Sequence, residues 1–104
     1  MSSTLKSALA IQCLPKIAGG NAETYRVVDA AIAVIEASGL PYTVGPFETV
    51  VEGDLDRLWA VAREAHQAIL DAGSEGCWTY MKLFSAPLLG SSEEKTAKYR
   101  AQGH

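Results

Sequence analysis

This chain of 104 residues predicts a single α+β domain whose elements follow the order β-α-β-β-α-β. Two long segments carry apolar residues at helical spacing, and the shorter segments around them carry apolar or β-branched residues with a period of two. Both helical segments end in glycine, in the sequences ASG and DAG, and a strand follows each of them closely. We therefore expect one domain over residues 1–104.

The first strand and the first helix occupy the beginning of the chain. The strand is expected over residues 5–14, where larger apolar groups alternate with Ala or Gln. Pro15 lacks an N–H donor and is expected to end this strand. The helix is expected to have Asn21 as its N-cap and Gly39 in the left-handed conformation at its end.

Two short strands joined by a tight turn come next. Residues 42–44 and 47–52 are rich in β-branched and aromatic groups, and a Gly-Pro pair separates them. The second long helix follows, with Asp54 expected as its N-cap and Gly73 at its end.

The last predicted elements are a strand over residues 77–84 and a short helix. Ser91 and Glu94 have the spacing of a capping box, which predicts the start of that helix. Right-handed crossovers place the two long helices on the same face of a four-stranded antiparallel sheet. This arrangement is the ferredoxin-like fold.

Three aromatic residues of the fourth strand, Trp78, Tyr80 and Phe84, are predicted to lie on the sheet face without helices. They alternate with a mostly aliphatic set that is expected under the helices. An exposed aromatic patch needs a cover, either a second subunit or a ligand. Gln12 and Lys82 alternate onto the same face, and a small polar ligand would supply the partners that buried polar groups need.

Composition argues against nucleic acid and membranes as partners. The net charge is -3, and the nine Lys and Arg residues are scattered along the chain. No run reaches the roughly 18 apolar residues of a membrane span, and no leader pattern is present, so we expect a cytoplasmic protein. Cys13 and Cys77 are far apart and outside any CxxC pair, which predicts reduced, buried thiols.

Sequence signals for other chemistries are weak. Neither GxxxxGK[ST] nor GxGxxG occurs, and His66 and His104 have no neighbouring ligand residue at metal-binding spacing, so no cofactor or metal is expected. Asp54 and Asp56 are explained by helix capping and the helix dipole. No Ser or Cys has a sequence-adjacent activating partner, so no catalytic residue is predicted.

Three stretches resemble a known family over essentially the whole chain. They are IQCLP in the first strand, YTVGPFETVVEGDLDRL from the hairpin into the second helix, and EEKTAKYR near the end. They resemble the small thiamine-binding proteins of the MTH1187/YkoF group, which are of the UPF0045 type. The resemblance implies a ferredoxin-like homo-oligomer, a dimer or tetramer, that binds thiamine or its hydroxymethylpyrimidine part without catalysis. Phe84 stands where this family often has an acidic residue.

The resemblance and the chemistry of an aminopyrimidine together give five candidate ligand-binding residues. Thr49 and Gln12 each donate and accept hydrogen bonds, which suits an amino group beside ring nitrogens. Glu52 would accept from the amino group. The ring would stack on Trp78 or Tyr80, whose faces also attract a thiazolium cation.

Two alternative functions stay open at this point. Small ferredoxin-like dimeric enzymes of the oxygenase or isomerase type hold their sites between sheet and helices, which would require His66 or an acid directed into that space. A purely structural or regulatory module would use the aromatic face only for assembly.

Overall fold

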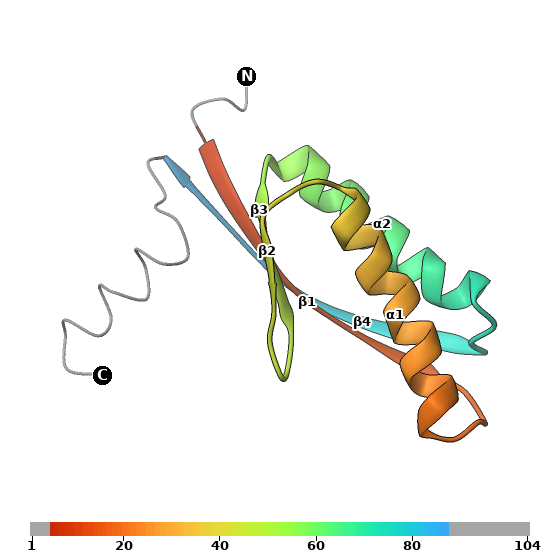
Figure 1. Ribbon diagram of the computed structural model, residues 1–104. Coiled ribbons are helices and arrows are strands. Elements are labelled where there is room, and N and C mark those ends of the chain that lie inside the picture. Colours follow the sequence, from red (N-terminus) through yellow and green to blue (C-terminus); the bar gives the residue numbers. More distant parts are fainter. Residues whose placement is uncertain (1–4, 88–104) are drawn as a thin grey trace, which may run out of the picture.

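Four strands form one antiparallel sheet in the computed structural model, which describes residues 5–87, and two helices cover one face of this sheet (Figure 1). The elements are β1 (Leu5–Lys16), α1 (Asn21–Ala37), β2 (Tyr42–Val44), β3 (Thr49–Gly53), α2 (Leu55–Asp71) and β4 (Gly76–Pro87). The strand order is β2-β3-β1-β4. The predicted ferredoxin-like fold is confirmed. The short helix predicted from Ser91 lies outside the described residues.

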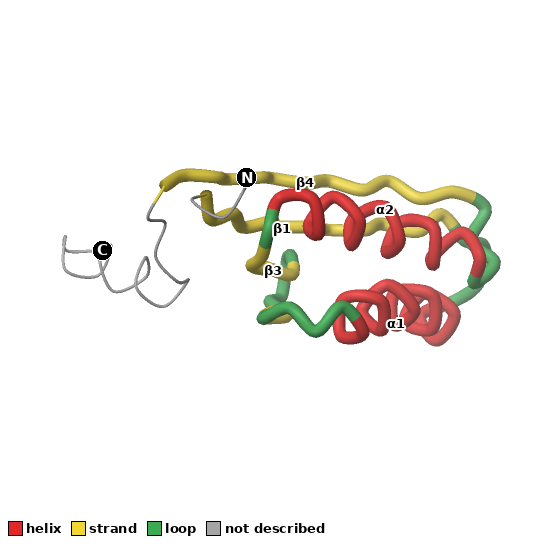
Figure 2. Tube along the Cα trace, turned by 90° about the horizontal axis from the view of Figure 1, so that it is seen from above, coloured by secondary structure: helices red, strands yellow, loops and turns green. Residues whose placement is uncertain are grey.

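The two helices lie side by side and enclose the core against the sheet (Figure 2). α2 contacts β1, β3 and β4, whereas α1 contacts α2 and β1. The largest fully buried side chains are those of Leu9, Val27, Val51, Leu58 and Ile69. The aliphatic set of β4 packs against this core, as predicted. Within residues 5–87, neither helix is long and apolar enough to cross a membrane.

β1 continues past Pro15 to Lys16, so the prediction that Pro15 ends the strand is wrong. The N–H of Lys16 donates to the Ser74 hydroxyl at 3.1 Å, and its C=O accepts from the N–H of Glu75 at 2.9 Å, both on the β4 side. Successive residues of an antiparallel strand direct their main-chain groups to opposite neighbours. Pro15 therefore faces away from β4, and its missing N–H removes no bond of the β1–β4 ladder.

The start of α1 differs from the prediction by one residue. Gly20 is the N-cap and Asn21 is the first helical residue, because the C=O of Gly20 already accepts from the N–H of Thr24 at 3.1 Å. Glycine is well tolerated at an N-cap. The predicted N-cap position of α2, Asp54, is confirmed, and its C=O accepts from the N–H of Leu58 at 2.9 Å, but its side chain makes no capping hydrogen bond.

The predicted glycines follow the helix ends in the left-handed conformation, with φ of 76° at Gly39 and 109° at Gly73. An arginine of the other helix also reaches each end.

Arg26 of α1 donates to the C=O of Ala72, the C-cap of α2, at 2.8 Å. Arg57 of α2 donates to the C=O of Ser38, the C-cap of α1. A cation is favourable at the negative end of a helix dipole. The two helices therefore cap each other reciprocally.

The two neighbours of β1 pair with it over different lengths. The β4 ladder runs along the whole strand, from Leu5 opposite Pro87 to Lys16 opposite Gly76. The β3 ladder covers only Ser7 to Ile11. Residues 12–16 of β1 are therefore paired on the β4 side alone within the described sheet.

Candidate ligand-binding site

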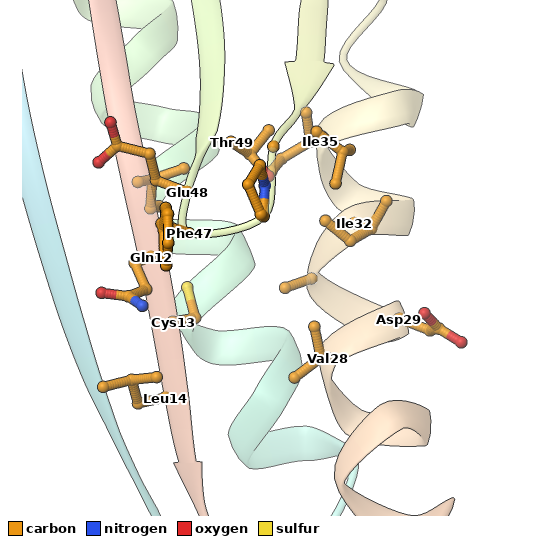
Figure 3. Close-up of a pocket in the computed structure, with 15 residues that line it drawn as sticks. Gln12, Cys13, Leu14, Val28, Asp29, Ile32, Ile35, Phe47, Glu48 and Thr49 are labelled. Atoms are coloured by element: carbon orange, nitrogen blue, oxygen red, sulfur yellow. The ribbon is translucent and has the colours of Figure 1, made fainter.

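A cleft of about 320 Å³ opens between α1, the singly paired part of β1 and the hairpin that joins β2 to β3 (Figure 3). This volume is at the lower end of the range for small-molecule sites in proteins. The larger aliphatic residues that line it are Ile11, Leu14, Val28, Ile32, Ile35 and Val44. Its polar side chains belong to Gln12, Asp29, Glu48 and Thr49.

The cleft exists because β3 begins only at Thr49, which leaves the part of β1 after Ile11 without a partner in β3. The last pair of the β1–β3 ladder is Ile11 opposite Thr49. Just before it, the hairpin turn is closed by the N–H of Gly45, which donates to the C=O of Glu48 at 2.9 Å. A Cβ atom on residue 45 would lie 2.9 Å from that oxygen, so this close approach requires glycine. The turn thus shapes one wall of the cleft.

Thr49 is the predicted site residue that lies inside the cleft. Its place opposite Ile11 directs its side chain to the helix side of the sheet, where the residue is only 6% exposed. Its hydroxyl makes no hydrogen bond within residues 5–87. No fully buried polar side-chain atom in that range lacks a partner, so the hydroxyl is reachable from the cleft. It can donate one hydrogen bond to a ligand and accept another.

Gln12 lies at the rim of the cleft. It is opposite Tyr80 in the β1–β4 ladder, and Figure 3 shows its side chain on the other side of β1 from that of Cys13. In the described part of the chain its carboxamide has no hydrogen-bond partner. Gln12 is therefore available both to the cleft and to the open face of the sheet.

Two acidic residues are among those that line the cleft, but neither carboxylate points into it in Figure 3. Glu48 pairs with Lys82 of β4 at 3.6 Å, and their side chains are 38% and 78% exposed. Asp29 extends from α1 and points outward in Figure 3. Because an exposed ion pair contributes at most about 1 kcal/mol, Glu48 can exchange Lys82 for another cation at small cost.

The remaining predicted site residues lie on the open face of the sheet: Glu52, Trp78 and Tyr80. The two aromatic residues are 55% and 59% exposed, so the predicted aromatic patch lies on the surface of this chain. Glu52 is half-buried. The sheet separates these three side chains from Thr49, and Gln12 lies at the edge between the two groups. The structure therefore does not bring the five predicted residues into one cavity.

His66 has a partner that the sequence did not reveal. Its Nδ1 lies 2.6 Å from Oγ1 of Thr79 in β4, and the same oxygen lies 3.6 Å from Sγ of both Cys13 and Cys77. Both thiols are free and half-buried. Within residues 5–87 no three His, Cys, Asp or Glu side chains are grouped so that they could hold a metal ion.

Burial raises the pKa of the Cys13 thiol, although the hydrogen bond from Thr79 opposes this shift. The thiol therefore stays protonated at neutral pH, and it is a poor nucleophile there.

Comparison with known proteins decides the family. The model of the thiamine-binding protein family matches residues 9–100. The chain belongs to the thiamine-binding protein family. A UPF0045 protein of Clostridium perfringens shares 29% identity with this family member over 92 residues, which is 88% of this chain and 95% of the relative.

Several solved protein structures have the same fold as this member of the thiamine-binding protein family. A domain of unknown function, DUF77, from Bacillus cereus has a TM-score of 0.84 and 36% identity, with 98% of this chain and 97% of that chain covered. A Thermotoga maritima protein, provisionally assigned to thiamine biosynthesis or salvage, has a TM-score of 0.76 and 26% identity over 91% of this chain and 99% of its own.

The sequence analysis missed the α1 side of the cleft. Helical spacing shows that Val28, Ile32 and Ile35 share an apolar face, but not which part of that face β3 leaves uncovered. The cleft residue Glu48 could have been suspected, since it is a charged residue beside the turn of an otherwise apolar hairpin.

Proposed function

We propose that this chain binds thiamine, or its hydroxymethylpyrimidine part, in the cleft beside Thr49 and does not transform it. The observation that carries the proposal is the reachable Thr49 hydroxyl within an apolar cleft of about 320 Å³. A pyrimidine has apolar faces and a polar edge, so it needs apolar walls and a few donors and acceptors. The family and the provisional assignment of the Thermotoga relative support this choice of ligand.

The charge around the cleft suits the second half of thiamine. Its thiazolium ring carries a positive charge, and Glu48, one of the residues that line the cleft, directs its carboxylate to the face of the sheet that also carries Lys82. A thiazolium placed there replaces Lys82 as the partner of Glu48 without burying an unpaired charge. We expect the pyrimidine to lie inside the cleft and the thiazolium to lie outside.

A binding function without catalysis is supported by Cys13, which lines the cleft, and by His66, which is hydrogen-bonded to the same threonine as Cys13. The Cys13 thiol is protonated at neutral pH, and His66 is hydrogen-bonded to Thr79. An enzyme of the oxygenase or isomerase type would need an activated base or nucleophile directed at the ligand.

The open face of the sheet supports assembly into a homo-oligomer. Trp78, Tyr80 and Phe84 are each more than half exposed and lie on one strand. Packing against the same face of a second copy would remove three aromatic side chains of each copy from water around a two-fold axis. Gln12 and Glu52 would then lie close to the subunit contact. We propose a cytoplasmic dimer, or a tetramer built from dimers.

Calorimetry and thermal denaturation with thiamine and with hydroxymethylpyrimidine test the ligand. A ligand that binds only the folded state stabilises it by about 2.7 kcal/mol at a hundredfold excess over Kd. We expect both compounds to raise Tm. The absence of binding by both compounds at millimolar concentration would contradict the proposal. The chain would then be an assembly module that uses the aromatic face alone.

Thr49→Val separates the cleft from the assembly surface. Valine keeps the shape of threonine and removes the hydroxyl, so we expect Kd for hydroxymethylpyrimidine to rise about threefold to tenfold, the effect of one lost hydrogen bond. The matched control is Thr43→Val on exposed β2, which should leave Kd unchanged. Sedimentation should give the same oligomer for both variants. Equal Kd values of Thr49→Val and Thr43→Val for hydroxymethylpyrimidine would show that the Thr49 hydroxyl does not contact the ligand.

A further inference from the structure

The main chain of β1 presents an unpaired donor and acceptor to the cleft. Lys16 directs both its N–H and its C=O toward the β4 side, and the register with β4 is unbroken from Leu5 to Lys16. Because main-chain groups alternate in direction along an antiparallel strand, the N–H and C=O groups of Gln12 and Leu14 also point toward β4. Cys13, between them, points both of its main-chain groups in the opposite direction, toward the cleft.

The alternation along β3 supports this orientation independently. The N–H of Glu52 donates to the C=O of Pro41 at 3.0 Å, on the side away from β1. The N–H and C=O groups of Thr49 must then point toward β1, where Thr49 is paired with Ile11. This is the last rung of the β1–β3 ladder.

The next rung would join Cys13 to Phe47, and it is not formed. Phe47 lies before the start of β3, and no hydrogen bond links it to Cys13 in the described residues. The N–H and C=O of Cys13 therefore have no partner within residues 5–87, although Cys13 lines the cleft. Main-chain groups of this kind rarely stay unpaired away from water. A ligand that pairs with the N–H and C=O of Cys13 therefore satisfies two main-chain groups that otherwise have no partner within residues 5–87.

Pro15 limits what can pair with this edge. After Cys13 it is the next residue whose main chain points toward the cleft, and it has no N–H to donate. An added peptide strand needs donors at every second residue, so the edge suits a strand poorly. It offers one complete donor and acceptor pair at Cys13, which suits a single planar heterocycle.

We propose that the main chain of Cys13 is the element that recognises the ligand of this cleft, a heteroaromatic ring with a ring nitrogen beside an amino group. This inference rests on the proposed function and deepens it. The Cys13 N–H donates to the ring nitrogen, and the Cys13 C=O accepts from the amino group. The ring lies where β3 would have continued, with one face toward Ile32 of α1 and the Thr49 hydroxyl nearby.

This arrangement makes recognition independent of the Cys13 side chain and dependent on its amide. The variant Cys13→Ala keeps both main-chain groups, so its Kd for hydroxymethylpyrimidine is the reference against which the loss of the amide is measured. The decisive variant carries lactic acid at position 13, introduced by nonsense suppression. It has the side chain of alanine, but an ester oxygen replaces the N–H. We expect its Kd to be about tenfold higher than that of Cys13→Ala, as for one lost hydrogen bond.

The same ester change at position 10 is the matched control. Ala10 is opposite Lys82 of β4, its amide faces β4, and it does not line the cleft, so lactic acid there, compared with the original chain, should lower stability and leave Kd within about twofold. Tm measured for each ester and its alanine counterpart separates the two effects. A position 13 ester that binds as tightly as Cys13→Ala would overturn the inference while the proposed function stands. A chain that binds neither thiamine nor hydroxymethylpyrimidine would overturn both.

The ligand offers a second and independent test. In a 4-oxo pyrimidine, such as that of oxythiamine, the ring nitrogen beside the substituent carries a proton and the substituent accepts. Both hydrogen bonds to Cys13 are then mismatched, so oxythiamine should bind at least tenfold more weakly than thiamine. The 15N-labelled Cys13 amide should shift on addition of thiamine, and the shift should be larger than that of the Ala10 amide, which lies outside the cleft. Equal affinity for the two compounds, or an unmoved Cys13 amide at saturation, would contradict the proposed role of Cys13.

Discussion

The two halves of this domain have the same order of elements, yet one is closed and the other is open. On the β4 side, β1 is paired along its full length, and α2 packs across three strands. On the β3 side, the ladder ends at Ile11, and α1 contacts β1 next to a cleft. The same supersecondary unit thus forms a fully paired support in one half and leaves a cleft in the other. The difference comes from the length of one strand pairing.

Polar groups are also treated differently in the two halves. In the closed half the Ser74 hydroxyl donates to the C=O of Gly76 at 2.6 Å and accepts from the N–H of Lys16. His66 is likewise paired with Thr79. In the open half the side chains of Thr49 and Gln12 have no hydrogen-bond partner among residues 5–87. Unpaired polar groups beside apolar walls are a feature of binding sites, because structural polar groups are normally satisfied.

The largest expected effect contrasts two large-to-small substitutions. Leu58→Ala empties a site in α2 that is 0% exposed, so it should lower the free energy of unfolding by about 2–5 kcal/mol. Ile32→Ala, in the half-buried wall of the cleft, should cost only about 1–2 kcal/mol and should weaken ligand binding. Urea denaturation and calorimetry measure both. Equal destabilisation by the two variants would show that the cleft wall is a closed core in solution.

A second contrast removes the same hydroxyl from each half. Thr79→Val leaves Nδ1 of His66 without its partner and should cost about 1–2 kcal/mol. Thr49→Val removes a hydroxyl that makes no hydrogen bond within the described residues, so stability should stay within about 0.5 kcal/mol. Thermal denaturation of both variants without ligand gives the comparison. A larger loss for Thr49→Val than for Thr79→Val would contradict the assignment of closed and open halves.

The smallest expected effect is the dependence of stability on pH through Cys13. Burial raises the pKa of this thiol in the folded chain above its ordinary value of 9.0. The folded state therefore holds its proton to higher pH than the unfolded state does. The resulting contribution is fully present below about pH 9 and is lost as pH rises through the folded pKa.

Comparison of the original chain with Cys13→Ala between pH 7 and pH 10.5 isolates this contribution. The stability difference between the two should be constant up to about pH 8.5 and should then move in favour of Cys13→Ala. Urea denaturation at each pH provides the measurement. A difference that stays constant up to pH 10.5 would mean that the Cys13 thiol is not shifted.

The fold could be predicted because several independent signals agree. Glycine ended each helix, and the alternation along β4 placed Trp78 and Tyr80 on the face opposite the core residues. Pro15 misled the prediction because a proline interrupts pairing only on the side to which its N–H would point. That side depends on the register, which the sequence alone does not reveal.

The candidate site was predicted only in part, because it combined residues from both faces of one strand. Thr49 and Glu52 are three positions apart in an extended strand, so their side chains must point to opposite faces. This separation could have been derived from the sequence. The cleft itself could not, because it depends on where the β1–β3 pairing ends. The proposed role of the Cys13 main chain is even harder to predict from the sequence, since any residue other than proline at that position has the same N–H and C=O.

The reciprocal arginine caps have a consequence for how a ligand enters. Moving α1 away from the sheet on its own would break both the hydrogen bond from Arg26 to Ala72 and that from Arg57 to Ser38. The helices are therefore expected to move together, on the slower timescale of collective motions. Within residues 5–87 no hydrogen bond or ion pair joins the hairpin turn at residues 45–48 to α1, and turns of this kind move within nanoseconds to microseconds. Association and release rates should accordingly follow changes in the turn, and they should be insensitive to changes on the outer surfaces of the helices.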